Sequence, residues 1–193
     1  MHPALFEPAT LVVGQPRRSR WRRYVGPALA VSTVEGTLLA VVTQLTPSQY
    51  ALREPSGPLV VRIRKRSRFG EFWAARFHFT DAGGRDVGTA GARGLVKTAQ
   101  LTLHTAQGRR LFLTRRSLLP GLWELTETDP EPNERPEPVG RVTARSADPW
   151  LGLQEYVVEM DARLEPAERR TLIASVVCLH LLRRPPGSSA ATA

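Results

Sequence analysis

Apolar and polar residues alternate along most of this chain in short runs, and glycine-containing turns separate the runs. Phe77-His78-Phe79 alternates in this way, the turn Asp81-Ala82-Gly83-Gly84 follows, and the pattern resumes at Asp86-Val87-Gly88. Leu101–His104 and Leu111–Leu113 flank a turn at Gly108 in the same manner. A two-residue period on both sides of a glycine turn is typical of a β-hairpin with one buried face.

The hairpin pattern recurs five times. Its turn glycines lie at positions 36, 57, 84 and 108 in the first four copies, and these spacings of 21, 27 and 24 residues indicate an internal repeat. The fifth copy has an expanded loop rich in proline and glutamate between its strands. One further strand is expected at each end of the series. The remaining predicted strands are Leu11–Val13, Leu29–Val31, Leu38–Val42, Tyr50–Leu52, Leu59–Ile63, Leu122–Thr126, Val139–Ala144 and Tyr156–Met160.

One segment near the carboxyl end is apolar on all sides. Thr171–Leu182 reads TLIASVVCLHLL, and as a helix it would be about 18 Å long, too short to cross a hydrocarbon core of about 30 Å. A helix of this kind is expected to be buried within protein. Pro166 suits a first helical turn, and Pro185-Pro186 ends the helix. We therefore predict one helix from about Pro166 to Arg183.

The strands and the helix together predict the fold. Twelve strands in one sheet would leave unpaired edges unless the sheet closes on itself. A twelve-stranded barrel is wider than the eight-stranded kind that side chains alone can fill, so the apolar helix is the natural filling. We expect a mainly β protein, a closed antiparallel twelve-stranded β-barrel around a central hydrophobic C-terminal α-helix. Residues 1–184 would form this single domain, with the plug helix at about 166–183, and residues 185–193 a disordered tail.

The repeated strand–(Asp/Thr)-x-x-Gly–strand units at Phe77–Gly88 and Leu101–Leu113 resemble those of the tubby C-terminal-like superfamily, which includes the LURP-one-related proteins and the phospholipid scramblases. The final unit, with Tyr156–Asp161 before Pro166–Arg170 and Leu172–Val177, is similar too. The resemblance implies a barrel around a hydrophobic helix. It leaves the function open, because tubby proteins bind phosphoinositide headgroups whereas scramblases are associated with calcium-dependent lipid movement.

The functional motifs of these relatives are not matched. No tubby headgroup-binding motif is found, so the resemblance transfers no binding residues. The region before the helix, where scramblases are thought to bind calcium, contains only Asp161, Glu165 and Glu168, with arginines among them. This density of oxygen ligands is too low for a calcium loop.

The charge of the chain suggests an anionic partner. The net charge is +9, and of the 27 basic residues only Lys65 and Lys97 are lysine. Such an excess favours association with a lipid surface or a nucleic acid, and the planar arginine fork suits phosphate. The single cysteine, Cys178, excludes a disulfide framework and a multi-cysteine zinc site. No nucleotide-binding, hydrolase or metalloprotease motif occurs, so we expect a non-enzymatic protein without a cofactor or a metal.

The candidate site consists of arginine rows on strands. On a strand, Val61 and Ile63 share one face while the arginines between them share the other, at intervals of about 6.6 Å. A second row alternates with Val142. The candidate anion-binding residues are Arg62, Arg64, Lys65, Arg66, Arg68, Arg141 and Arg145. A solvated outer face of a barrel would show the same pattern, so both interpretations stay open.

Three hypotheses for function follow from these features. The first is docking onto anionic phospholipid headgroups at a membrane surface, by a monomeric cytoplasmic protein peripheral at the inner membrane. This location assumes that the run from Tyr24 to Leu45, which the Glu35-Gly36 turn interrupts, is a hairpin and not a secretory signal. The second is a basic β-barrel that binds nucleic acid, or an uncharacterised structural or interaction protein. The third, a small-molecule hydrolase or carrier, requires an internal pocket lined by His180 or Cys178.

Overall fold

The computed structural model describes residues 6–15, 29–66, 75–93, 99–116, 121–129, 136–148 and 153–183. These residues form twelve strands followed by one helix, α1 (Pro166–Arg183). The strands are β1 (Thr10–Gly14), β2 (Leu29–Ser32), β3 (Leu38–Thr46), β4 (Gln49–Arg53), β5 (Leu59–Arg66), β6 (Arg76–Thr80), β7 (Asp86–Arg93), β8 (Gln100–Thr105), β9 (Arg110–Arg115), β10 (Gly121–Thr126), β11 (Gly140–Asp148) and β12 (Leu153–Met160).

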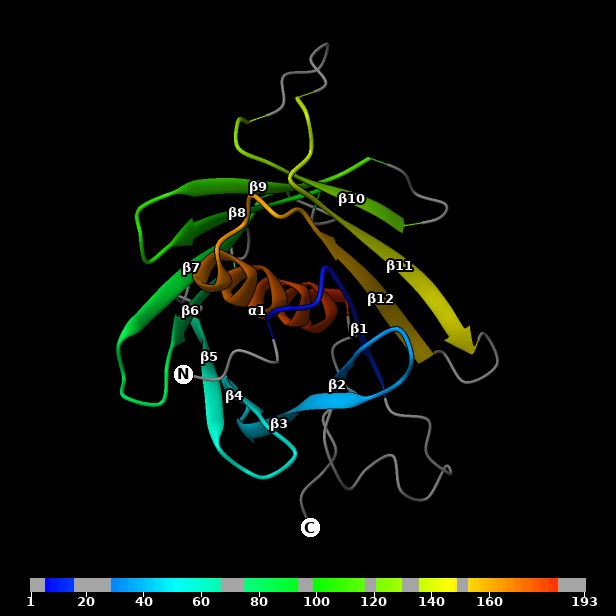
Figure 1. Cartoon of the computed structure of the whole chain (residues 1–193). Helices are drawn as coiled ribbons and strands as arrows, with labels where there is room; N and C mark the ends of the chain where they lie inside the picture. The colour runs from blue at the N-terminus through cyan, green and yellow to red at the C-terminus, as the bar shows by residue number, and fades with distance from the viewer. Residues whose placement is uncertain are drawn as a thin grey trace.

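The sheet is a closed antiparallel barrel (Figure 1). Each strand pairs with the next one in the sequence, and β1 also pairs with β12, for example Val12 opposite Val157. The predicted hairpin turns are present, and Gly84 and Gly108 adopt φ values of 79° and 81°, a region that glycine reaches without a Cβ penalty. The predicted closed twelve-stranded barrel is therefore confirmed.

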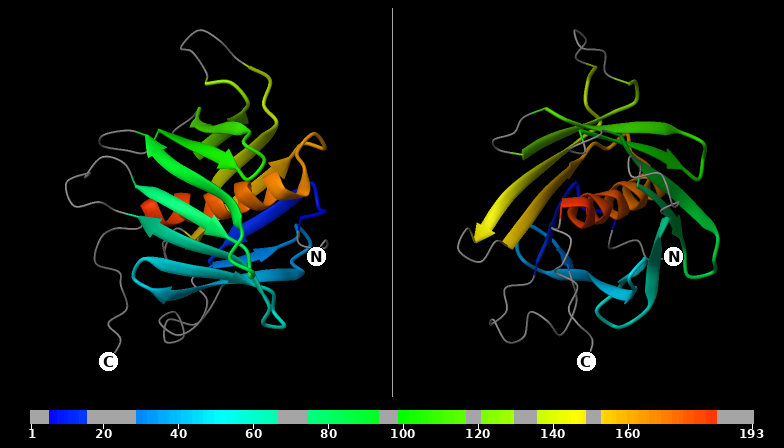
Figure 2. Two further views of the ribbon diagram at one scale, coloured as in Figure 1. Left: turned by 90° about the vertical axis from the view of Figure 1, so that its left-hand side faces the viewer. Right: turned by 180° about the vertical axis from the view of Figure 1, so that it is seen from behind.

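The helix α1 runs through the inside of the barrel, as Figures 1 and 2 show from three sides. Residues 171–180 are all buried, and Ile173 and Val177 have no exposed surface. Along the strands, buried side chains alternate with exposed ones, as in β6, where Phe77 and Phe79 are buried and Arg76 is exposed. The predicted plug helix is thus confirmed, and its apolar surface is matched by the inward faces of the strands.

The helix approaches β7 most closely at a glycine. Thr171 Oγ1 donates a hydrogen bond to the Val87 carbonyl oxygen at 3.0 Å. Gly88, the next residue, has φ +146°, and a Cβ at this position would lie 3.1 Å from Thr171 Oγ1 and well inside contact distance of the His104 carbonyl oxygen. The absence of a side chain at Gly88 therefore allows the helix to pack against this wall.

The two ends of the barrel differ. Short turns at residues 33–37, 54–58, 81–85, 106–109 and 161–165 gather at the end where α1 begins, which we call the turn end. Strand β5 ends and β6 begins at the opposite end. Within the described ranges, no helix combines the length and the apolarity that crossing a membrane requires. The tail predicted for residues 185–193 lies outside the described residues, as does Arg68.

Candidate functional site

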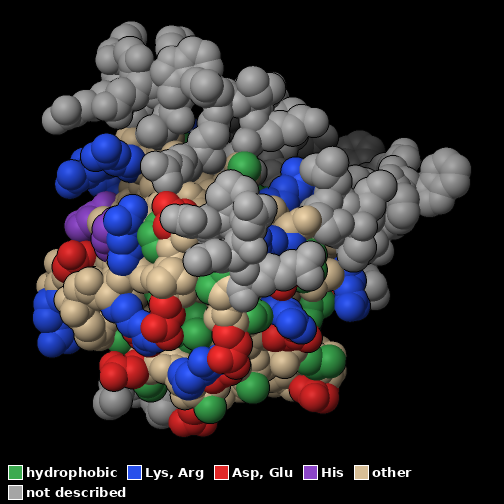
Figure 3. Space-filling model, turned by 90° about the horizontal axis from the view of Figure 1, so that it is seen from above, with side chains coloured by type: hydrophobic (Ala, Val, Ile, Leu, Met, Phe, Trp, Pro, Cys, Tyr) green, Lys and Arg blue, Asp and Glu red, His purple; other side chains and the backbone are tan. Residues whose placement is uncertain are grey.

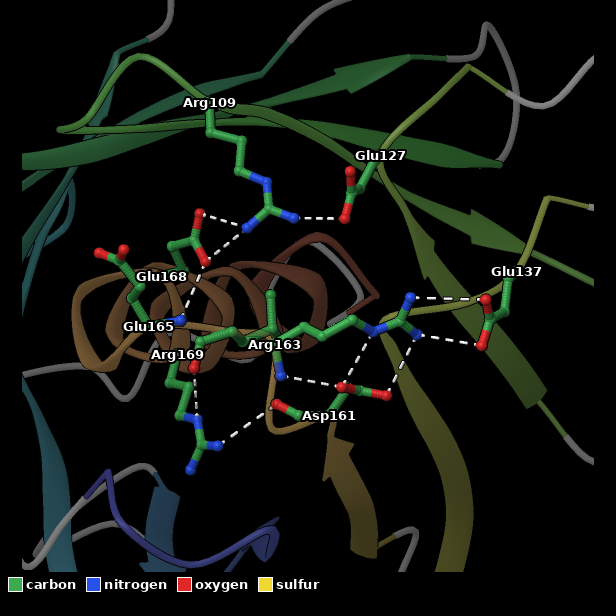
Figure 4. A network of polar contacts seen from close by, with 9 residues as sticks. Arg109, Glu127, Glu137, Asp161, Arg163, Glu165, Glu168 and Arg169 are labelled. Atoms are coloured by element: carbon green, nitrogen blue, oxygen red, sulfur yellow. Dashed lines mark hydrogen bonds and ion pairs between the residues drawn. The ribbon is translucent and has the colours of Figure 1, made fainter.

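The turn end carries a network of charged side chains that fixes the start of α1 (Figure 4). Arg109 Nη1 donates to both carboxylate oxygens of Glu168, at 2.9 and 2.8 Å, and Arg109 Nη2 donates to Glu127. Glu168 is buried, and its Oε2 also accepts the backbone N–H of Glu165 at 3.0 Å. The hydrogen bonds to Glu168 raise the pKa of Arg109. These contacts cap the helix and leave the Glu168 carboxylate engaged by protein donors.

The same network holds the turn between β12 and α1. Arg163 Nε and backbone N–H both donate to Asp161 Oδ1, at 3.1 and 2.8 Å, and hydrogen bonds from the Arg163 side chain lower the pKa of Asp161. Arg169 donates to the carbonyl oxygens of Leu164 and Phe6, at 3.0 and 3.1 Å. The carboxylates Asp161 and Glu168 are therefore already paired with arginines. Among the described residues, no group of three or more potential metal ligands occurs.

The interior of the barrel offers little chemistry. Ser175 Oγ donates to the Thr171 carbonyl oxygen at 2.7 Å, a bond within the helix, and does not pair with His180. The His180 ring packs edge-on against Tyr156, with 6.0 Å between the ring centroids. Burial raises the pKa of the Cys178 thiol well above its usual value, which keeps the thiol protonated and unreactive.

Two hollows of about 410 and 200 Å³ lie elsewhere. The first is lined by residues of β1, β11 and β12, and the second by residues that include Phe6 and Arg170. Neither is lined by His180 or Cys178. The internal pocket that the carrier or hydrolase hypothesis requires is therefore not one of these two hollows.

The arginine row predicted on β5 faces outward. Val61 and Ile63 are fully buried, while Arg62, Arg64 and Arg66 are exposed. Lys65 stands opposite Phe77 in register, on the inward-facing side of β5, but is exposed because the strand ends here.

Among the residues that the structure describes, no acid stands in register with this row. On β6, Thr80 lies opposite Arg62, His78 opposite Arg64, and Arg76 opposite Arg66. On β4, the residues opposite Arg62 and Arg64 are Ala51 and Gln49. Like charges directly opposite each other on a sheet are destabilising. A bound anion would therefore reduce the repulsion between Arg66 and Arg76. We call the outward-facing residues Arg62, Arg64, Arg66 and Arg76 the basic face.

The predicted row on β11 has different surroundings. Arg141 lies between Glu124 on β10 and Glu159 on β12, and Arg145 lies opposite Glu155. Opposite charges in register partly offset each other through space, although Glu124 itself forms an ion pair with Arg116, with 3.0 Å between Arg116 Nε and Glu124 Oε2. Strands β5 and β11 are separated by five strands in either direction around the barrel, so the two rows lie on opposite walls. The candidate residues therefore do not converge on one site.

The structure adds cationic residues that the sequence reasoning did not select. One outward rung runs across five strands, with Arg64 opposite His78, His78 opposite Thr89, Thr89 opposite His104, and His104 opposite Arg110. Figure 3, which shows the molecule from above, has a histidine side chain beside Lys and Arg side chains near one edge of that face, and Asp and Glu side chains mainly in its lower half. The alternation of apolar and polar residues around each histidine indicates that its side chain faces outward. Only the register between neighbouring hairpins shows that the histidines and arginines lie on one rung.

These features define the class of protein as a closed twelve-stranded antiparallel barrel, filled by its own C-terminal helix, with a basic outer wall at β5 and β6. Comparison of the chain with models of known families, with curated proteins and with solved structures finds no significant match.

Proposed function

We propose that this protein is a non-enzymatic binding protein that docks onto anionic phospholipid headgroups through the basic face. The observation that carries the proposal is the difference between the two arginine rows. Arg62, Arg64 and Arg66 face outward with neutral or basic residues opposite them, whereas Arg141 and Arg145 face glutamates. Guanidinium groups with no described acid in register are the ones available to donate paired hydrogen bonds to phosphate oxygens.

The shape of the molecule favours a surface as the ligand. The basic face is an extended row on a convex wall, with its arginines about 6.6 Å apart along β5. Such a row can contact several headgroups at once, and each basic residue near an anionic leaflet contributes about 1 kcal/mol. The resemblance to tubby-like proteins is compatible with this proposal and stays a prediction, since a barrel alone does not identify that superfamily. A peripheral position at the cytoplasmic surface of the membrane is part of the same proposal.

Liposome co-sedimentation with two matched variants tests the proposal. R62Q/R64Q removes two charges from the basic face, and R141Q/R145Q removes two charges from the opposite wall. Vesicles of phosphatidylcholine with and without phosphatidylglycerol would be compared at about 0.1 M salt, where charges about 10 Å apart are partly screened. We expect wild-type protein to bind only the anionic vesicles, R62Q/R64Q to bind about 25-fold more weakly, and R141Q/R145Q to stay within about threefold of wild type.

Two results would overturn the proposal. Equal weakening in both variants would show that net charge, and not the basic face, attracts the protein. Failure to bind either kind of vesicle, together with binding to DNA or RNA oligonucleotides that weakens steeply with salt, would favour the nucleic-acid alternative.

A further inference from the structure

We infer that His78 and His104 make docking by the basic face dependent on pH, so that mildly acidic conditions extend the binding surface from β5 across to β9. This inference rests on the proposed function and adds a means of regulation to the same wall. It arises from the outward rung Arg64, His78, Thr89, His104 and Arg110, in which each histidine stands directly beside an arginine.

The geometry places each histidine where its charge matters for an anion on this wall. Residues directly opposite in an antiparallel sheet have Cα atoms about 4.5–5.5 Å apart, so an arginine and a histidine at that separation can donate to one phosphate. Arg64 with His78, and His104 with Arg110, form two such pairs. Thr89 lies between them on β7, so the strip of cations is continuous except for one hydroxyl.

The groups facing His78 are mostly cationic. Arg64 lies opposite it on β5, and Arg76 is two residues away on β6 itself. The exception is Asp86 on β7, whose Oδ1 lies 3.4 Å from His78 Nε2. Asp86 Oδ1 also accepts the backbone N–H of Gly88 at 3.0 Å. When His78 is protonated, this contact becomes an ion pair that orients the ring while its other nitrogen remains a donor.

The described residues in register with His104 offer one hydroxyl and one cation. On β7 its neighbour is Thr89, and on β9 its neighbour is Arg110. The Arg110 guanidinium stacks over the Phe112 ring, with its central carbon 4.8 Å from the ring centroid, which holds this cation against the wall. Both His104 and Arg110 are exposed, so protonation of His104 adds a positive charge to the outer surface beside a fixed guanidinium.

The expected effect is about tenfold. Histidine is the side chain whose charge changes within the physiological pH range, so the two histidines can add up to two positive charges to this wall as the pH falls. Each added charge near an anionic leaflet strengthens binding about fivefold. The other two histidines are less suited to this role, because His180 is buried inside the barrel and His2 lies outside the described residues.

Co-sedimentation with phosphatidylglycerol vesicles at about pH 7.5 and 5.5 tests the inference, since this phosphodiester keeps its charge over the range. Wild-type protein should bind about tenfold more tightly at the lower pH. H78Q/H104Q should show less than about twofold change in binding between the two pH values. H2Q, the matched control, should keep the full pH dependence.

The outcomes separate the inference from the proposed function. Failure of wild-type protein to bind anionic vesicles at either pH would refute the proposed function itself. Binding whose pH dependence is the same in wild type and in H78Q/H104Q would refute the role of the histidines while leaving docking by the arginines intact. Loss of pH dependence in H2Q would assign it to the amino-terminal segment instead.

Discussion

Replacement of Gly88 by alanine tests the packing of the plug helix against the barrel wall. The Cβ of an alanine at position 88 would lie 3.1 Å from Thr171 Oγ1. It would be closer to the His104 carbonyl oxygen than van der Waals contact allows. The backbone φ of +146° at Gly88 is also a conformation that costs a residue with a Cβ about 1–3 kcal/mol. To relieve this clash, β7, β8 or the helix must move. Such overpacking typically costs about 1–3 kcal/mol more.

We therefore expect G88A to lower the free energy of unfolding by about 2–6 kcal/mol. For a domain of this size, a loss of about 2 kcal/mol already lowers Tm by about 4–8 °C. Gly91 provides the matched control, because it lies three residues further along the same strand and a Cβ there meets no atom within 4 Å. G91A should stay within about 0.5 kcal/mol of wild type in urea unfolding followed by circular dichroism. Equal stability of G88A and G91A would refute the close contact between α1 and β7.

Three further predictions concern the charged turn end and the helix. E168A should lower the free energy of unfolding, measured by urea titration, by about 2–3 kcal/mol. This loss is smaller than for a fully buried ion pair because Arg109 is 31% exposed. Cys178 should react with a thiol reagent only under unfolding conditions, because burial raises its pKa; rapid reaction of native protein would place the thiol at the surface. Hydrogen bonds from Arg163 lower the pKa of Asp161, so the stability that this pair contributes is present at neutral pH and is lost as the pH falls through the lowered pKa. D161N should therefore lose less Tm than wild type as the pH falls, in a profile of Tm against pH.

The fold was accessible from the sequence because its signals are local and repeated. Alternation around glycine turns gives each hairpin, and the count of strands then demands closure. The plug helix could be predicted because Thr171–Leu182 is apolar on every side and has no other place to be buried. Both inferences use only short-range pattern and the cost of exposed apolar surface or unpaired strand edges.

The site was only partly accessible, because it depends on register between hairpins. Sequence alternation places Arg64, His78 and His104 on outer faces but does not say which residues stand opposite one another. The pairing of Arg64 with His78 spans the segment 67–74, and that of Arg141 with Glu159 depends on the closing strand β12. The charge that surrounds each arginine therefore emerges only when the strands are paired.

The distribution of charge also gives the proposed docking an orientation. The lumen is filled by α1, so contact with a large ligand must occur on the outside of the barrel. At the turn end, Arg109 and Arg163 are each shared by two carboxylates, so this network keeps an excess of negative charge that an anionic surface would repel (Figure 4). Arg66 and Arg76 lie at the opposite end of the same barrel. Attraction at one end and repulsion at the other exert a torque on the molecule, so docking through the basic face should tilt the barrel with the turn end away from the headgroups.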